Sequence, residues 1–383
     1  MKVKITSDST CDLSPELIEK YDIAITPLSV HCGDQVGRDG VEITPETIYD
    51  YVEASGQLPR TSAVNVFDYV REFRHWRQQG YSIVHFCISS DFSSSYQNAC
   101  IAAADIGQVY VVDSRNLSTG QGLLVLHGAE LAAAGQTAEE IQKACTDLAP
   151  QVEASFVIDR LDYLYKGGRC SALSAFGGNL LKLKPCIEVK DGKMIPGKKY
   201  RGPIDKVMLQ YADDRLRGRD DINKHRVFIT HTRCAPEAVE AVRQKILELA
   251  PDFEEIIETT AGSTVTSHCG PGTLGVLFIL IVILVYIVMA TQFESLLFPF
   301  IIMFTIPFAA TGVFLALWMT STPMSLIALI GAIMLVGIVT KNGIVMVDYM
   351  NLLIERGSGV FDAVIAGGKS RLRPVLMTSF TTI

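Results

Sequence analysis

Charged residues are absent from two long stretches in the last third of this 383-residue chain. No Asp, Glu, Lys or Arg occurs from residue 259 to residue 293, and none occurs from residue 295 to residue 340. A domain that folds in water carries charged side chains over most of its surface. Their absence argues against an ordinary soluble domain beyond about residue 275, whereas charges occur every few residues before Thr259.

Three further absences narrow the function of the first part. None of the nine cysteines forms a Cys-x-x-Cys pair, which argues against a zinc site and predicts reduced, buried thiols in a cytoplasmic protein. The N-terminus lacks the apolar segment of a secretory signal peptide. The chain has 34 basic and 41 acidic residues, of which five basic and four acidic ones lie after residue 274. The part before it therefore has 29 basic and 37 acidic residues. This acidic balance argues against nucleic-acid binding.

Short apolar runs alternate with helix signals in residues 1–151. The runs at residues 3–5, 25–30, 83–88 and 109–112 are typical of buried strands. Ser14-Pro15 and Thr44-Pro45 each combine a capping hydroxyl with proline at the first helical position, and residues 66–79 have helical spacing of apolar side chains. Strands that alternate with helices predict a parallel sheet with helices on its faces.

The same alternation returns between residue 152 and about residue 278. Strands are predicted at residues 155–158, 227–230 and 255–259, and a helix is predicted at residues 236–249. Residues 187–196 are typical of a hairpin that turns at Asp191-Gly192. We therefore expect an α/β fold with parallel or mixed sheets, made of lobes 1–151 and 152–278 with a ligand cleft between them.

Hydroxyl side chains cluster beside the predicted strand ends. Thr61 and Ser62 precede one helix, and Ser93 and Ser95 open another. Hydroxyls and free backbone N–H groups at a helix N-terminus form an anion site. His268 could supply a further hydrogen bond or a positive charge. Simple helix capping by each hydroxyl and a structural role for His268 are the alternative interpretations.

Several ordered motifs of residues 1–278 resemble the DegV family. They are Ile-Thr-Ser-Asp-Ser-Thr-Cys-Asp-Leu at residues 5–13, Thr-Ser at 61–62, the segment 88–99, Tyr-Leu-Tyr-Lys-Gly-Gly-Arg-Cys-Ser at 163–171, and His-Cys-Gly-Pro-Gly-Thr-Leu-Gly-Val at 268–276. The resemblance implies a two-lobed α/β fold that holds one long-chain fatty acid. It also implies a carrier role, in which the carboxylate of the fatty acid is presented to a separate fatty acid kinase for phosphorylation.

The resemblance also implies which residues hold the head group. Thr61 and Ser93 would bind the carboxylate with His268 nearby, and their neighbours Ser62 and Ser95 would flank them. Arg169 and Arg201 match positions that the family places beside the head group or at the kinase surface. Residues 93–95 are all serine where the family usually has Ser-Gly-Thr. Ser94 would therefore alter the local backbone if that position requires a positive φ.

The family resemblance implies a binding protein rather than an enzyme, with no metal and no cofactor. A Ser–His–Asp hydrolase that uses Ser93, His268 and either Asp8 or Asp113 is the alternative. The chain has no Gly-x-Ser-x-Gly motif, which argues against the nucleophile turn of that class. No Gly-x-Gly-x-x-Gly follows the first predicted strand, which argues against a dinucleotide-binding enzyme.

Long apolar runs dominate the sequence after residue 274. The runs at residues 274–290, 296–319 and 324–340 approach or exceed the roughly 20 residues that span a bilayer as a helix. We predict an all-α segment of about three transmembrane helices that would hold residues 274–347 in the inner (cytoplasmic) membrane. Four basic residues follow the third run and place that end in the cytoplasm: Arg356, Lys369, Arg371 and Arg373. This topology would put residues 1–278 outside, in conflict with the cytoplasmic location expected for them.

The apolar region resembles the inner-membrane permease of resistance-nodulation-division (RND) efflux pumps. The matching segments are residues 290–297, 306–312, 337–345 and 371–378. Lys341 matches the proton-relay lysine of that family, whose partner aspartates come from a helix of the other half of the pump. We interpret residues 279–383 as a fragment that does not transport by itself.

The chain as a whole is therefore interpreted as a chimera with its join in residues 275–283. An artefact of sequence assembly or a frameshift is the simplest explanation of such a join. A genuine fusion that tethers a fatty-acid carrier to the membrane is the first alternative. A proton-coupled transporter-related protein with a fused accessory part is the second.

Overall fold

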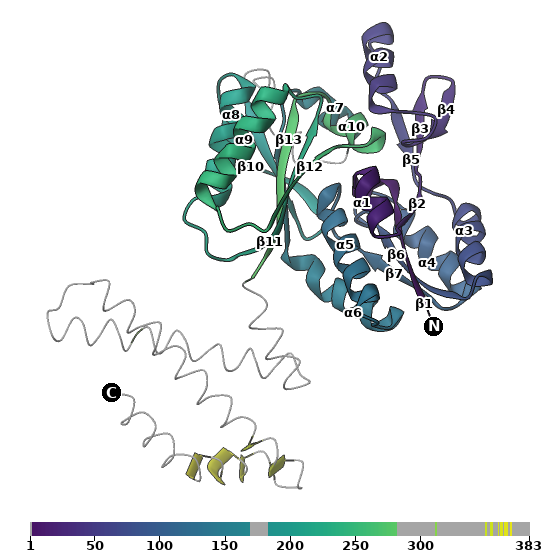
Figure 1. Cartoon of the computed structure of the whole chain (residues 1–383), viewed down its shortest axis with the longest axis vertical. Helices are drawn as coiled ribbons and strands as arrows, with labels where there is room; N and C mark the ends of the chain where they lie inside the picture. Colours follow the sequence, from purple (N-terminus) through teal and green to yellow (C-terminus); the bar gives the residue numbers. More distant parts are fainter. Residues whose placement is uncertain are drawn as a thin grey trace, which may run out of the picture. The chain divides into compact units, whose positions relative to one another are not determined.

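The computed structural model describes residues 2–168 and 183–281, together with scattered positions between 311 and 369. The chain divides into two compact units, Met1–Ile281 and Val282–Ile383. The first unit contains three β-sheets with helices packed against them (Figure 1). The site described below lies entirely within this first unit.

A four-stranded parallel sheet forms the centre of the N-terminal lobe, in the order β2-β1-β6-β7. Its strands are β1 (Lys2–Asp8), β2 (Ala24–Thr26), β6 (Tyr81–Cys87) and β7 (Val109–Asp113). Alternate side chains of a strand point to opposite faces. Ile83 and Cys87 pack with helices α3 (Val66–Gln78) and α4 (Ser95–Ile106), whereas Val84 and Phe86 pack with α5 (Thr119–Ala133). The predicted parallel sheet with helices on both faces is confirmed.

A six-stranded mixed sheet follows, in the order β10-β9-β8-β13-β11-β12. Its strands are β8 (Val152–Val157), β9 (Lys184–Lys190), β10 (Lys193–Tyr200), β11 (Ile222–Thr232), β12 (Glu255–Thr260) and β13 (Thr273–Leu280). Strands β11 and β12 pair in parallel, and the other neighbours pair antiparallel. Helices α8 (Ile204–Leu216) and α9 (Pro236–Leu249) share a core with Val227 and Ile229 on one face of this sheet.

A third, smaller sheet and several short helices complete the unit. The antiparallel strands β4 (Gln35–Arg38), β3 (Ser29–Cys32) and β5 (Arg60–Ser62) lie in that order. Ile48 of helix α2 (Pro45–Ser55) packs with Val30 of β3. The remaining elements are η1 (Ser9–Cys11), α1 (Pro15–Lys20), α6 (Ala138–Leu148), η2 (Ala149–Gln151), α7 (Leu161–Gly167) and α10 (Ser263–Cys269).

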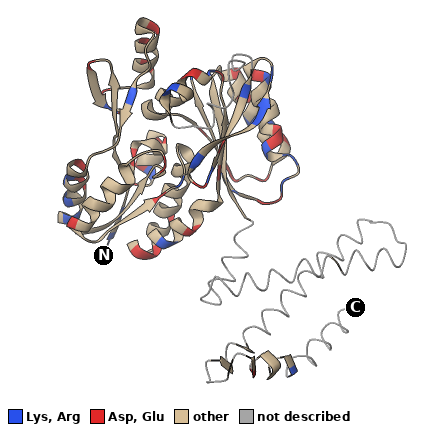
Figure 2. Ribbon diagram, turned by 180° about the vertical axis from the view of Figure 1, so that it is seen from behind, with Lys and Arg blue, Asp and Glu red and all other residues tan. Residues whose placement is uncertain are grey.

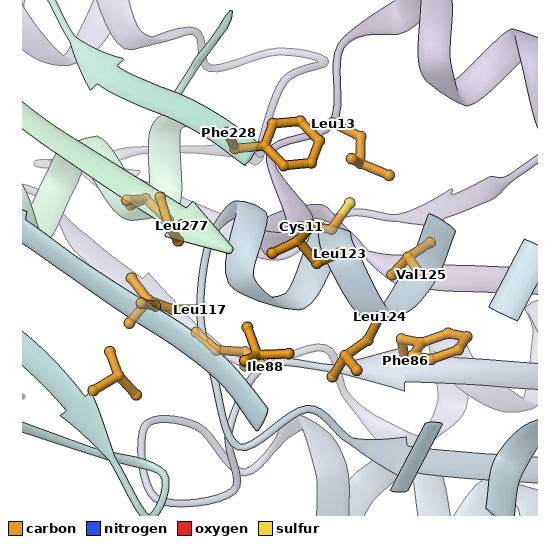
Figure 3. Packing of buried hydrophobic residues seen from close by; sticks show 14 of the residues in the cluster. Cys11, Leu13, Phe86, Ile88, Leu117, Leu123, Leu124, Val125, Phe228 and Leu277 are labelled. Carbon is orange, nitrogen blue, oxygen red and sulfur yellow. The ribbon is translucent and has the colours of Figure 1, made fainter. Parts of the chain in front are cut away.

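Helix α5 packs against both larger sheets and joins them through one hydrophobic core. Ten of its fifteen residues are buried, as expected for a helix that is apolar on every side. Figure 3 shows Phe228 and Leu277 of the second sheet near Leu123 of α5, with Phe86 of the first sheet beside the same helix. A Cβ atom at Gly128 would lie 2.7 Å from Phe86 Cζ, so glycine permits this close approach. The two lobes therefore share one core around α5, in addition to the cores that each has on the other face of its sheet.

Charged residues lie mainly on the outer helices and loops, with both signs on the same elements (Figure 2). A group of partly buried ion pairs joins Glu153 of β8 to Arg215 of α8 and to Arg219, which also pairs with Asp221. The participating side chains are 17–29% exposed. This network attaches the C-terminal end of α8 to the six-stranded sheet.

Most local predictions are confirmed, and one strand prediction is wrong. Ser14 accepts the Leu17 N–H at the start of α1, and Thr44 forms a capping box with Thr47 at the start of α2. The β9–β10 hairpin turns at Asp191 and Gly192, whose φ angles are 51° and 79°. The apolar run 25–30 is two strands in different sheets, β2 and β3, rather than one. Pro27 separates them because proline has no N–H to donate to a sheet.

The predicted membrane-spanning run that starts at residue 274 is wrong over its first seven residues. These residues belong to β13, which pairs antiparallel with β8 and β11 inside the six-stranded sheet. Val276 and Phe278 enter the core beneath α8 and α9, whereas Leu277 enters the core around α5. Burial on both faces explains a continuous apolar strand without lipid.

The rest of the predicted membrane segment lies outside the described residues, apart from scattered positions, and Lys341 is among those not described. In the part of the chain that the structure describes, no helix combines the length and the apolar character needed to cross a membrane.

Candidate ligand-binding site

A cavity lies among β5, the loop before α4, α10 and the hairpin strand β10. About 500 Å³ of space without protein atoms, part of it open to solvent, lies between its walls. The apolar lining residues are Leu28, Ala63, Ile88, Phe92, Leu117, Met194, Val265 and Cys269, and the polar ones are Thr61, Ser62, Ser93, Thr264 and His268. These described lining residues include no Asp, Glu, Lys or Arg. The cavity therefore combines an apolar wall with neutral hydroxyls and one imidazole.

Thr61 and His268 meet across this cavity although they are 207 positions apart in the sequence. The distance between Thr61 Oγ1 and His268 Nε2 is 2.9 Å, a hydrogen bond whose donor depends on the histidine tautomer. Thr61 lies on β5, so the next residue points to the other side of the strand. The Ser62 hydroxyl bonds His31 Nε2 at 3.0 Å instead. Of the two predicted hydroxyls, it is Thr61 that is paired with the imidazole.

Ser93 borders the cavity, and Ser95 lies directly behind it. Ser93 Oγ accepts the Ser95 N–H at 3.2 Å and lies 2.9 Å from Ser95 Oγ, which is fully buried. A serine hydroxyl has one donor and two acceptor positions, so Ser93 can accept the first N–H of α4 and still donate to a ligand. Ser94 has φ −76°. The backbone here needs no positive φ, and serine in place of glycine is tolerated.

Burial dominates the electrostatics around the cavity. Desolvation raises the pKa of the Cys269 thiol to about 12, so this residue lines the cavity as a neutral group. Burial also raises the pKa of the Tyr69 hydroxyl, which interacts with Ser95, well above its ordinary value. An anionic ligand would therefore meet neutral hydrogen-bond donors rather than a fixed counter-ion.

The family model described as "Uncharacterised protein, DegV family" matches residues 2–280. This chain belongs to the DegV family. A fatty acid-binding protein of Thermotoga maritima is 34% identical over 284 residues, which is 72% of this chain and 96% of that protein. A DegV domain-containing protein of Clostridium acetobutylicum is 34% identical over 282 residues, which is 73% of this chain and 98% of that protein.

Solved structures of DegV proteins share the fold. A fatty-acid-binding DegV family protein from Thermus thermophilus is 31% identical with a TM-score of 0.67, and the match covers 73% of this chain and 100% of that one. A stearic acid-binding protein from Eubacterium ventriosum is 28% identical with a TM-score of 0.62, and the match covers 73% and 98%. The predicted α/β fold of the DegV family, with parallel and mixed sheets, is confirmed.

A second family model, AcrB/AcrD/AcrF, matches residues 230–383. The resemblance of the C-terminal part to efflux permeases is therefore confirmed at the level of the family. The two matches overlap over residues 230–280. In the structure the shared residues include β12, α10 and β13 of the DegV unit.

Arg201, which the resemblance predicts near the head group or at the kinase surface, is not among the described residues that line the cavity. Arg201 is exposed and lines a different cavity, beside Lys198, Asp214 and Lys245. Its expected place at the fatty-acid head group is not what the structure has, and a place at a partner surface stays a prediction. Arg169 lies outside the described residues.

The carboxylates nominated for a hydrolase have other partners. Asp8 is fully buried and accepts hydrogen bonds from Thr10, Gln121 and the Ile88 N–H. Asp113 Oδ1 accepts the N–H groups of Ser90 and Arg115. His268 has Thr61 at its Nε2 instead. These contacts give the two aspartates structural roles in the loops of the DegV sheet.

Sequence reasoning missed the apolar wall of the cavity. Met194 reaches it from the β9–β10 hairpin of the second sheet, whose turn accepts a hydrogen bond from Ser89 Oγ at Gly192 O. Leu28, Phe92 and Leu117 come from three separate loops of the first lobe. No local pattern marks such residues, because they are neighbours only after folding. Among the described residues, no group of three or more His, Cys, Asp or Glu could hold a metal ion.

Proposed function

We propose that this chain binds a long-chain fatty acid in the cavity, with the carboxylate beside Thr61, Ser93 and His268. The observation that carries the proposal is the Thr61–His268 hydrogen bond at 2.9 Å in a cavity whose described wall is otherwise mainly apolar. The names of several related proteins state that those proteins bind fatty acids.

The chemistry of the lining suits an amphipathic acid. A buried carboxylate without partners is strongly disfavoured, and hydrogen bonds to a charged group contribute about 1.5–3 kcal/mol each. The Thr61 and Ser93 hydroxyls and the His268 imidazole can supply such bonds. Each methylene group moved from water to the apolar wall contributes about 0.8 kcal/mol. Affinity should therefore rise with acyl chain length until the cavity is full.

The direct test combines ligand extraction with titration. Mass spectrometry of lipid extracted from the purified protein should show a fatty acid, and the delipidated protein should bind it again. Ser93→Ala should weaken binding about tenfold or more, because a bond to the carboxylate is lost. Ser14→Ala is the matched control, since it removes a capping hydroxyl from α1, an element that does not line the cavity. A delipidated protein without affinity for any long-chain acid would exclude the proposal.

We further propose that the bound acid is presented to a separate fatty acid kinase in the cytoplasm. The family resemblance supports this role, and binding rather than catalysis by this chain is its consequence. Incubation of the loaded protein with a fatty acid kinase and ATP should yield an acyl phosphate, which hydroxylamine converts to a hydroxamate. Hydrolysis of a short acyl ester that disappears in Ser93→Ala would instead support the hydrolase alternative.

For residues 282–383 we propose no transport by this segment itself. The match to efflux permeases over residues 230–383 favours a membrane-associated origin. Proton flux in vesicles that contain the full chain should be absent, and flux lost in Lys341→Ala would contradict the proposal. Sequencing of single DNA molecules across codons 260–300 would decide whether one gene encodes both parts.

A further inference from the structure

Among the described residues, helix α10 supplies more of the cavity wall than any other single helix, yet it has only seven residues. Thr264, Val265, His268 and Cys269 all belong to it and line the cavity. Its N-cap residue, Gly262, provides no side chain to cap the helix. A short helix without its own cap is not stable alone. The position of His268 therefore depends on whatever holds the first turn of α10.

Two buried carboxylates from the N-terminal lobe hold that first turn. Asp12 Oδ1 accepts the Gly262 N–H at 2.8 Å, and Asp39 Oδ1 accepts the Ser263 N–H at 2.8 Å. Asp12 is 7% exposed and Asp39 is 4% exposed. These contacts bridge 250 and 224 positions of the sequence.

The same carboxylates also bond serines that adjoin other lining segments of the cavity. The second oxygen of Asp12 accepts the Ser118 hydroxyl, whose neighbour Leu117 lines the cavity. The second oxygen of Asp39 accepts the Ser9 hydroxyl at 2.8 Å.

Leu28, another lining residue, is hydrogen-bonded to Ser9 and Asp39 through its backbone N–H and carbonyl groups. Its N–H donates to Ser9 Oγ at 3.1 Å, and its carbonyl accepts the Asp39 N–H at 2.8 Å. Helix α10, Leu117 and Leu28 are thus joined through two aspartates and two serines that do not line the cavity.

We propose that Asp12 and Asp39 are positioning residues that set α10, and with it His268, against Thr61. This inference rests on the proposed fatty-acid site. Neither aspartate touches the ligand; each acts through the backbone of α10. The loss of either carboxyl leaves a buried N–H without its acceptor, and α10 then shifts or frays so that the Thr61–His268 bond lengthens.

The role requires a hydrogen-bond acceptor rather than a negative charge. Burial raises the pKa of Asp12 to about 8, so its carboxyl is largely protonated at pH 7. An asparagine keeps one carbonyl oxygen for the backbone N–H, and its amide can donate to the serine that the second oxygen now contacts. Asparagine should therefore substitute for either aspartate, whereas alanine should not.

The test compares delipidated full-length variants by fatty-acid titration and by NMR of the imidazole of His268. Asp39→Ala should weaken binding on the order of tenfold, equivalent to about 1.4 kcal/mol, whereas Asp39→Asn should stay within about twofold of the wild type. The His268 resonance, assigned with His268→Gln, should shift in ligand-free Asp39→Ala but not in Asp39→Asn. Ser9→Ala, a milder change, should weaken binding a few-fold and covers the case in which Asp39→Ala does not fold.

The matched control is Tyr211→Phe. Tyr211 is fully buried and its hydroxyl bonds Ser155 and the Val276 N–H in the core beneath α8, which does not line the cavity. This variant should lose thermal stability without losing affinity or moving the His268 resonance. Wild-type affinity in Asp39→Ala, or an unmoved His268 resonance, would overturn the inference. If the wild type binds no fatty acid, the proposed function fails, and the His268 resonance still decides the positioning role.

Discussion

The hydrogen bond between Thr61 and His268 predicts that the two side chains act as a coupled pair in binding. Thr61→Val keeps the shape of the side chain and removes the hydroxyl that lies 2.9 Å from His268 Nε2. It removes a bond to the ligand carboxylate, worth about 1.5–3 kcal/mol, and it also releases the imidazole from its orientation. His268→Leu removes the imidazole and leaves the Thr61 hydroxyl without its partner. Each single change therefore includes part of the effect of the other.

The expected coupling follows from this overlap. Two independent bonds to a carboxylate would sum to about 3–6 kcal/mol in the double variant. Contacting residues in one network typically show interaction energies of about 0.5–3 kcal/mol. We expect the double variant to lose about 1–2 kcal/mol less than the sum of the two single losses.

The wild type, the two single variants and the double variant form a double-mutant cycle. Titration calorimetry of the four delipidated proteins with one long-chain acid, at one pH and ionic strength, measures their affinities. A second cycle serves as the control, with Thr61→Val and Met194→Leu, because methionine and leucine fill similar volumes in an apolar wall. The control pair should be additive within about 0.5 kcal/mol. Additivity of Thr61→Val and His268→Leu, or undiminished affinity in Thr61→Val, would refute the reasoning from the 2.9 Å contact.

Three further outcomes are expected. Burial lowers the pKa of His85 to about 3 from its ordinary 6.5. Between these two pH values the histidine is protonated in the unfolded chain and neutral in the folded chain. Stability should thus fall as pH falls through this window, by up to about 1.4 kcal/mol per pH unit, and denaturant titrations of His85→Gln should lack this contribution. Gly167→Ala would place a Cβ atom 2.5 Å from His268 Nδ1; calorimetry should show affinity about tenfold weaker with unchanged circular dichroism. A chain ending at Ile281 should unfold cooperatively and keep its fatty-acid affinity, since the match with the Thermus thermophilus structure covers all of that chain, whereas a chain ending at Gly272 lacks β13 and should not fold.

Local features of this protein were readable from the sequence because their causes are local. The serine and threonine caps of α1 and α2 act within three residues, and the Asp191-Gly192 turn needs only two positions with positive φ. The motifs of residues 1–278 likewise indicate the DegV family, and the resemblance by itself implies Thr61, Ser93 and His268 as site residues. Helix α5, in contrast, has no amphipathic face, and only the packed structure shows that it lies between two sheets.

The apolar run from residue 274 shows why composition alone was insufficient. A strand buried on both faces and the start of a membrane helix have the same uncharged, aliphatic sequence. Seven residues of this run are β13 because β8 and β11 offer hydrogen-bonding edges on both sides of it. Sequence spacing does not reveal those partners, which lie far away in the chain.

The sequence by itself determined the fold class, the family and the chemical character of the site. Only the tertiary structure decided that Thr61 rather than Ser62 pairs with His268, that Arg201 lies apart, and that Asp12 and Asp39 hold α10. The physical reason is the range of the interactions. Caps and turns are decided by neighbours in the chain, whereas a binding site is assembled from segments more than 200 residues apart, by a core that buries both lobes against one helix.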